Sequence, residues 1–116
     1  MKVLELRPLA EIDLVERTRH YQEAGGVELG VRFFDAAVAA LSAIEAAPGI
    51  GSPRIGELIG VPEVRRIGVE GFPCGWLYLE RPESLDVVRM LTDRQEVAVL
   101  LDTLGSESRA EGRSEE

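Results

Sequence analysis

The sequence predicts an α+β fold in which an antiparallel sheet, made of an N-terminal strand and three C-terminal strands, packs against a two-helix hairpin. Residues 9–41 contain two stretches with helical spacing of apolar side chains, separated by two adjacent glycines. Residues 64–91 contain three short runs of strand-forming residues separated by turn residues. A fourth strand-like run stands before the first helix.

The chain begins with a short strand and an amphipathic helix. Residues 2–7 alternate apolar and charged side chains, and Pro8 ends this run. Apolar side chains then recur at helical spacing as far as about residue 23, which predicts a helix with one face in the core. Gly25 and Gly26 end this helix, and we expect Gly25 in the left-handed conformation. The residues expected to face the core are Leu9, Ile12, Val15 and, more loosely, Leu14.

The second helix is predicted from a stripe of apolar side chains at steps of four, three, four and three residues. The stripe consists of Val27, Val31, Phe34, Val38 and Leu41. Because this spacing follows one face of a helix, we expect the whole stripe to lie in the core. Two helices joined by a pair of glycines should pack as an antiparallel hairpin.

A long connection and three strands follow the hairpin. Prolines and glycines crowd residues 47–62, which predicts an irregular loop. The turns between the strands are short enough to make their pairing antiparallel. We expect strands at Val64–Val69, Gly75–Glu80 and Leu85–Leu91, and a short closing helix that carries Val97, Leu100, Leu101 and Leu104. Together these elements predict a single domain over residues 1–104 and a disordered acidic tail over residues 105–116.

Composition and charge narrow the class of protein. The 116 residues carry 13 basic and 21 acidic side chains, and Lys2 is the only lysine. An acidic chain repels polyanions, so a general binder of free nucleic acid is not expected. The single cysteine, Cys74, cannot form an intramolecular disulfide, and the charged start of the chain matches neither a signal peptide nor a membrane span. We therefore expect a cytoplasmic protein without membrane association.

Four segments, in this order, resemble the RelE/ParE toxin superfamily over residues 3–101. They are RPLAEIDLVERTRHY, RFFDAAVAALSAIEAAPGIGSPR, VRRIGVEGFPCGWLYLE and VVRMLTDRQEV. The resemblance implies the toxin of a type II toxin–antitoxin pair, held inactive by a cognate antitoxin protein. It also implies the RelE/ParE-like version of the predicted fold.

Departures from the family pattern favour a toxin without nuclease chemistry. RelE-type enzymes cut messenger RNA with clustered Lys and Arg, and with Tyr or His, which stabilise charge and move protons. Here Thr92 and Asp93 stand where a His and a small or basic residue are commoner, and only Arg89 and Arg94 match. The resemblance then implies a ParE-like toxin, a group associated with poisoning DNA gyrase. The alternatives are a RelE-type ribosome-dependent mRNA interferase and a non-toxic relic that acts as a protein-binding module or by homo-oligomerisation.

The candidate residues for binding a target or the antitoxin are Arg65, Arg66, Trp76, Arg89 and Arg94. A guanidinium can form paired hydrogen bonds with a carboxylate of a partner, and the alternative is a solvated strand face with weak ion pairs. Trp76 alternates onto one sheet face with Tyr78 and Cys74. We expect Trp76 to pack in the core, and the alternative is that it anchors a partner at an interface.

No catalytic residue, metal ligand or cofactor is predicted. His20 is the only histidine and has no Cys or His companions at the spacing of a metal site. The glycines around Gly49 are not followed by the Lys-Ser/Thr of a phosphate-binding loop. The partners that the resemblance implies are an antitoxin and a gyrase-type target protein, and a homodimer is left open.

Overall fold

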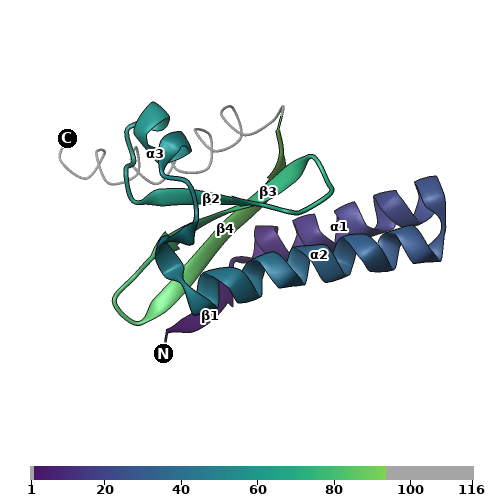
Figure 1. Cartoon of the computed structure of the whole chain (residues 1–116), viewed down its shortest axis with the longest axis horizontal. Coiled ribbons are helices and arrows are strands. Elements are labelled where there is room, and N and C mark those ends of the chain that lie inside the picture. The colour runs from purple at the N-terminus through teal and green to yellow at the C-terminus, as the bar shows by residue number, and fades with distance from the viewer. Residues whose placement is uncertain (1, 94–116) are drawn as a thin grey trace, which may run out of the picture.

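A four-stranded sheet carries a long helical hairpin on one face, as Figure 1 shows. The computed structural model describes residues 2–93. Its elements are β1 (Val3–Leu6), α1 (Pro8–Gly25), α2 (Val27–Ala46), the 3-10 turn η1 (Pro48–Ile50), α3 (Arg54–Ile59), β2 (Val64–Gly68), β3 (Cys74–Glu80) and β4 (Ser84–Thr92). The predicted closing helix, Arg94 and the predicted acidic tail lie outside the described residues.

The sheet has the strand order β1-β4-β3-β2. β2 pairs with β3 and β3 with β4 in antiparallel fashion, whereas β1 runs parallel to β4. The predicted α+β fold class is confirmed, and the parallel β1–β4 pair makes the sheet mixed rather than wholly antiparallel. Short turns dictate antiparallel pairing only between strands that are neighbours in sequence, and the hairpin, η1, α3, β2 and β3 all stand between β1 and β4 in the chain.

The first helix, α1, begins one residue before the predicted start at Leu9 and extends two residues beyond the predicted end near Glu23. Pro8 occupies the first turn of α1, where its missing N–H removes no helical hydrogen bond. Gly26, and not Gly25, has the positive φ, 89°, and its N–H donates to Gln22 O at 2.8 Å. A residue with a Cβ would be strained at this φ, so Gly26 allows the sharp reversal into α2.

The predicted core faces of both helices are wrong. Four members of the α2 stripe are exposed: Val27 by 66%, Val31 by 51%, Phe34 by 43% and Val38 by 39%. Of the predicted stripe only Leu41 is buried. On α1, Leu9, Ile12 and Val15 are also exposed, while Leu14 packs against the core as predicted. The buried residues of α2 are Gly30, Phe33, Ala37, Ala40, Leu41 and Ile44.

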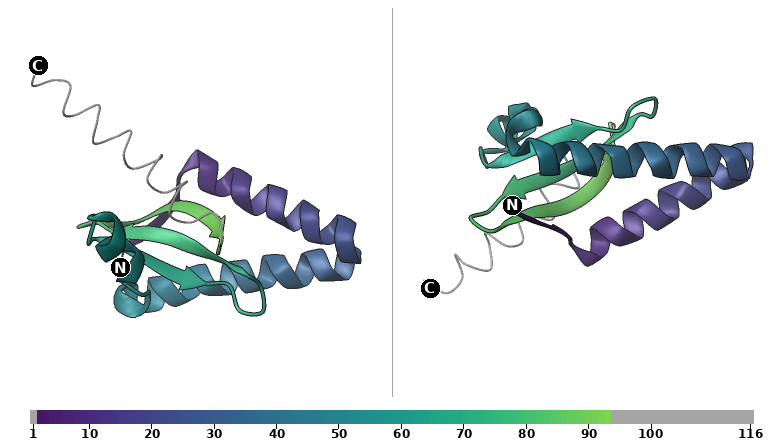
Figure 2. Two further views of the ribbon diagram at one scale, coloured as in Figure 1. Left: turned by 90° about the horizontal axis from the view of Figure 1, so that it is seen from above. Right: turned by 60° about the horizontal axis from the view of Figure 1, so that its bottom comes forward.

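The main core lies between the hairpin and one face of the sheet, which the two views of Figure 2 show from different sides. Trp76 and Tyr78 are fully buried there together with Phe33, which confirms that these strand aromatics pack under the hairpin. The indole Nε1–H of Trp76 donates to Ala37 O at 3.0 Å, so it also fastens α2 to β3.

The opposite face of the sheet has a second, smaller core. It contains Ile55, Val64, Leu77, Leu79, Val88 and Leu91. The segment 47–62, predicted as an irregular loop, instead forms η1 and α3, and α3 packs against this face. Gly56 permits the contact, because a Cβ there would lie 2.5 Å from both Val61 O and Val64 O.

Candidate functional site

Arg89 forms a two-pronged ion pair with Asp13, which joins the last strand to the first helix. Its Nε lies 2.7 Å from Asp13 Oδ2 and its Nη2 lies 2.9 Å from Oδ1. The Met90 backbone N–H also donates to Asp13 Oδ2 at 3.0 Å. The hydrogen bond to Asp13 raises the pKa of Arg89 further above its ordinary value. Asp13 therefore caps the edge of β4 beyond the last residue of β1 and neutralises Arg89.

A small pocket adjoins this pair, with a volume of about 280 Å³. Its walls are Asp13, Glu16, Arg17, His20, Arg89, Met90 and Leu91. The two carboxylates and the two guanidinium groups balance, so the walls favour neither a phosphate nor a cation. Because the Arg89 guanidinium is already hydrogen-bonded to Asp13, we do not expect the pocket to bind an anion strongly.

Arg66 lies in the same row of the sheet as Arg89. Arg66 pairs across the strands with Leu77, and Leu77 pairs with Arg89, which places both arginines on one face. Two strand spacings separate their backbones by roughly 10 Å. Arg66 Nη2 contacts Asp93 Oδ1 at 2.5 Å. The structure thus brings two of the predicted site residues to one face, each already paired with a carboxylate.

The other predicted residues do not join this row. Arg65 points the other way and donates from Nη1 to Gly51 O at 2.8 Å, which holds the η1 loop against the sheet. Trp76 is 0% exposed and presents no side-chain surface to a partner. Arg94 lies outside the described residues. Sequence reasoning missed Asp13 altogether, and no local pattern marks a partner 76 residues away from Arg89.

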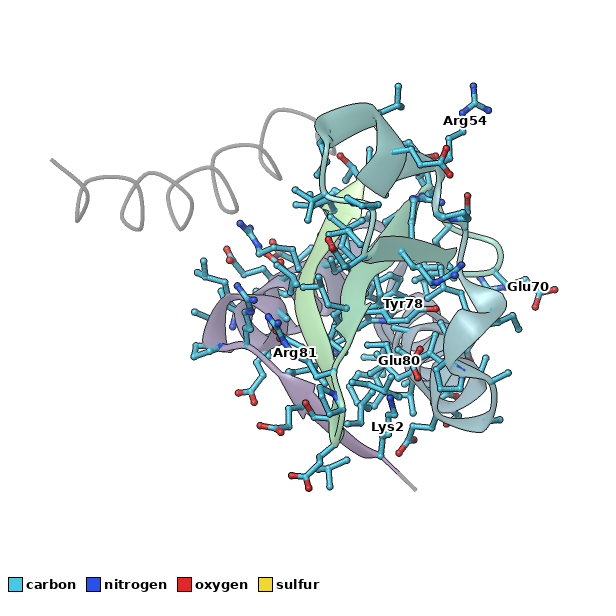
Figure 3. All side chains as sticks on the ribbon, turned by 90° about the vertical axis from the view of Figure 1, so that its left-hand side faces the viewer. Lys2, Arg54, Glu70, Tyr78, Glu80 and Arg81 are labelled. Atoms are coloured by element: carbon cyan, nitrogen blue, oxygen red, sulfur yellow. The ribbon has the colours of Figure 1, made fainter. Side chains whose placement is uncertain are left out.

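Asp86 is the centre of a second charged cluster, where β4 meets the start of α1. Arg7 donates to both carboxylate oxygens, at 3.0 and 2.9 Å, and Arg81 Nη2 lies 3.1 Å from Oδ2. Burial alone raises the pKa of Asp86, but the hydrogen bonds from Arg7 and Arg81 outweigh burial, so the pKa is lowered. In Figure 3, Arg81 lies at this end of the sheet near Lys2 and Glu80, whose own ion pair is 2.7 Å long.

The lowered pKa predicts a loss of stability in acid. The Asp86 carboxylate stabilises the fold fully above the ordinary carboxyl pKa of 3.8, and this stabilisation is lost as the pH falls through the lower folded-state pKa. We expect Asp86→Asn to cost roughly 1 kcal/mol in urea unfolding at neutral pH and almost nothing at about pH 2. Glu57→Gln, on the exposed side of α3, is the control and should cost little at either pH. A cost for Asp86→Asn that does not depend on pH would contradict the assignment.

Both helices of the hairpin carry large apolar side chains that are exposed. They are named here as two sets: the α2 stripe, now defined as Val27, Val31, Phe34 and Val38, and the α1 patch, defined as Leu9, Ile12 and Val15. Sequence reasoning placed both sets in the core. The sequence does contain a signal for these exposed side chains, because α2 has two apolar faces. One helix cannot bury both faces against one sheet, so one of the two must be exposed. Large exposed apolar patches mark protein-binding surfaces.

Within residues 2–93, no group of three His, Cys, Asp or Glu side chains could hold a metal ion. No helix in the same part of the chain has the length and hydropathy needed to cross a membrane. What the described residues offer is therefore paired arginines on the sheet and exposed apolar surface on the hairpin.

Comparisons with known proteins find a solved structure with a similar fold. No protein-family model matches the sequence, and no curated protein matches it. Among solved structures, a chain of the "Chromosomal ParDE TA system from P. aeruginosa" is similar, with a TM-score of 0.68 and 22% sequence identity. The similarity covers 79% of this chain and 96% of that chain. At this identity the likeness establishes the shared fold.

Proposed function

We propose that this chain, whose fold is RelE/ParE-like, is the toxin of a type II toxin–antitoxin pair and acts in the cytoplasm. The observation that carries the proposal is the match to a chain of a ParDE system over nearly that chain's whole length. The exposed apolar hairpin supports it as well, because a toxin must offer a large surface to the antitoxin that neutralises it. The cognate antitoxin is the first partner that the proposal requires.

Binding of a protein target fits the sheet better than RNA cleavage does. Arg66 and Arg89 face one side of the sheet, but Asp93 and Asp13 neutralise them. Cleaving RNA would require free positive charge at the scissile phosphate, and the chain as a whole is acidic. We therefore place the chain with ParE-like toxins, with a gyrase-type target, rather than with RelE-type mRNA interferases.

Expression of the chain alone in a bacterial host tests the toxin proposal. Growth should stop within a few generations and should resume when the small open reading frame beside the gene is co-expressed. The same gene with an early stop codon is the matched control and should leave growth unchanged. Uninterrupted growth with the full chain would remove the toxin proposal and leave a non-toxic binding module.

The target is tested separately, with purified protein. A ParE-like action predicts that the chain inhibits DNA supercoiling by purified gyrase and that equimolar antitoxin restores it. Codon-phased cuts in ribosome-bound messages, with gyrase unaffected, would instead select the mRNA interferase. In that case the Arg66–Leu77–Arg89 row would be the first place to look for the reacting groups.

A further inference from the structure

Strand β1 leaves one edge of the sheet open. It is an outermost strand in the order β1-β4-β3-β2, and within residues 2–93 no segment pairs with its outer side. The N–H groups of Val3 and Arg7 donate to residues that flank or belong to β4, at 3.1 and 2.9 Å. Backbone alternation therefore turns the N–H and C=O groups of Leu4 and Leu6 outward, where they form a template for another strand. In the right-hand view of Figure 2 this strand, dark purple beside the N-terminus, is the margin of the sheet.

The other outermost strand, β2, has outer backbone groups that its own chain already occupies. Ser52 and Arg66 exchange both backbone hydrogen bonds, at 2.8 and 3.0 Å. The Val64 N–H donates to Val61 O at 3.0 Å. The difference between the two edges singles out β1 as the place where a further strand can add.

β1 lacks the features that keep an edge strand from pairing. Its four residues include no proline and no lysine, and the Lys2 side chain just before them is held on the sheet by Glu80 at 2.7 Å. Val3 is 62% exposed, and Leu4 and Leu6 are only partly buried against the main core. A strand added here would therefore cover apolar side chains as well as backbone groups.

A second copy of β1 fits this edge in antiparallel orientation, about a two-fold axis at Leu4. In this register Leu4 faces Leu4 of the second copy and Lys2 faces Leu6, so that about six backbone hydrogen bonds form. The paired stretch ends before α1 begins. Glu5 lies opposite Val3 of the second copy, and its aliphatic stem covers this exposed valine.

The neighbouring registers fit less well. Only shifts by two residues keep the outward backbone groups paired. A shift towards α1 sets Glu5 directly opposite Glu5 of the second copy, where like charges oppose pairing. A shift the other way leaves Leu6 beyond Lys2 of the second copy and loses about two of the hydrogen bonds. The strand is thus complementary to itself in one register.

We propose that the chain forms a homodimer through β1, in which the two four-stranded sheets join into one continuous sheet with both hairpins on the same face. The inference goes beyond the proposed function and does not depend on it. Because only residues 2–6 of each copy pair, the buried area falls below the roughly 1,000 Å² of a stable interface. The dimer therefore forms at high concentration and dissociates on dilution.

Sedimentation equilibrium of the full chain over a concentration series tests the proposal. The average mass should rise from the 12.7 kDa of one chain towards twice this value as the concentration approaches about 1 mM. A mass that stays at one chain over the whole series would reject the dimer.

A matched pair of variants tests whether the outer edge of β1 is the contact. Leu4→Pro removes an outward N–H but keeps the ladder to β4, which uses the N–H groups of Val3 and Arg7. Leu4→Ala loses the same side chain and keeps the N–H. We expect Leu4→Pro to dimerise at least about tenfold more weakly than Leu4→Ala, with circular dichroism showing the same fold in both. Equal dimerisation of the two variants would place the contact elsewhere and overturn the proposal.

Cross-linking tests the register and does not require a proline in the strand. With oxidised glutathione, Leu4→Cys should form a covalent dimer, because Cα atoms of a hydrogen-bonded antiparallel pair lie about 5.5 Å apart, within reach of a disulfide. Leu6→Cys is the matched control: its two copies stand four residues apart along the strands, about 13 Å, and should not link. The native Cys74 is buried in both variants. Linking of Leu6→Cys alone, or of neither variant, would reject this register.

Two further outcomes would assign the edge to another occupant and overturn the proposal. A full chain that stays monomeric and dimerises only after deletion of residues 94–116 would assign it to the chain's own end. A monomeric chain in which the neighbouring-gene protein slows amide exchange at Leu4 and Leu6 would assign it to that protein.

Discussion

Replacing Trp76 by alanine should lower the free energy of unfolding by about 3 to 5 kcal/mol, the range for deleting a large aromatic from a core. Its side chain is fully buried between the sheet and α2, with Phe33 and Ala37 in the same cluster. The substitution leaves a cavity and also removes the hydrogen bond from the indole to Ala37 O. Since small domains are stable by only about 5 to 15 kcal/mol, we expect a protein that is partly unfolded at 37 °C.

Denaturant unfolding followed by circular dichroism measures this cost, because Trp76 is the only tryptophan and the variant has no indole fluorescence. Trp76→Phe is the matched change: it keeps most of the volume, loses the hydrogen bond and should cost roughly 2 kcal/mol. Leu58→Ala, at a side chain 70% exposed, is the control for a lost apolar group and should be nearly neutral. A neutral Trp76→Ala would mean that the indole lies at a surface, as an antitoxin anchor would.

The pair of Asp13 and Arg89 should give the second-largest effect. Removing either partner alone, by Asp13→Asn or Arg89→Met, leaves a charged group with little solvent around it, since the two side chains are only 15 and 18% exposed. We expect each single change to cost roughly 2 kcal/mol, below the range for fully buried pairs. The double variant should cost clearly less than the sum, because it leaves no unpaired charge.

A double-mutant cycle from urea unfolding measures this coupling, and its sign distinguishes two roles for Arg89. Strong coupling is expected of a guanidinium that fastens β4 to α1. If the losses in unfolding free energy of the two single variants add up in the double variant, Asp13 does not hold Arg89. Arg89 would then be available to bind a target. Glu11→Gln on the exposed side of α1 serves as the charge-matched control and should be close to neutral.

The strands could be predicted almost to the residue because their signals are local. Val64–Gly68, Cys74–Glu80 and Ser84–Thr92 are bounded by turn residues such as Gly71 and Pro82, and alternation correctly places Trp76 and Tyr78 on one face. The parallel partner of β1 could not be predicted in this way, because no short turn connects it to β4.

The helix faces could not be read correctly from apolar spacing alone. On α2, the buried set with Phe33, Ala37 and Ile44 and the exposed stripe with Val31 and Phe34 both follow helical spacing. The stripe is rich in large hydrophobic side chains, and for this reason the sequence pattern predicts that the stripe is the buried face. The sheet instead selects the face with alanines, because small side chains let a helix approach the bulky Trp76 and Tyr78 closely.

The candidate site was visible from sequence only as a set of residue types. Spacing identifies Arg65, Arg66 and Arg89 as strand arginines, but which face each occupies depends on register and on the irregularity of the pairing near Leu77. Their carboxylate partners come from distant parts of the chain: Asp13 is 76 residues from Arg89, and Asp93 is 27 residues from Arg66. The sequence around an arginine does not indicate a carboxylate partner that is so distant in the chain.

The position of β1 also bears on the order in which the chain can fold during synthesis. The first strand of the described chain, Val3–Leu6, has its partner in Ser84–Val87, so this partner is not made until nearly the whole described chain has been synthesised. The hairpin can form early from local contacts, but the sheet cannot be completed until β4 lies between β1 and β3. For that interval the nascent chain carries an unpaired strand next to an apolar hairpin surface, a state in which early capture by a partner protein would be most useful.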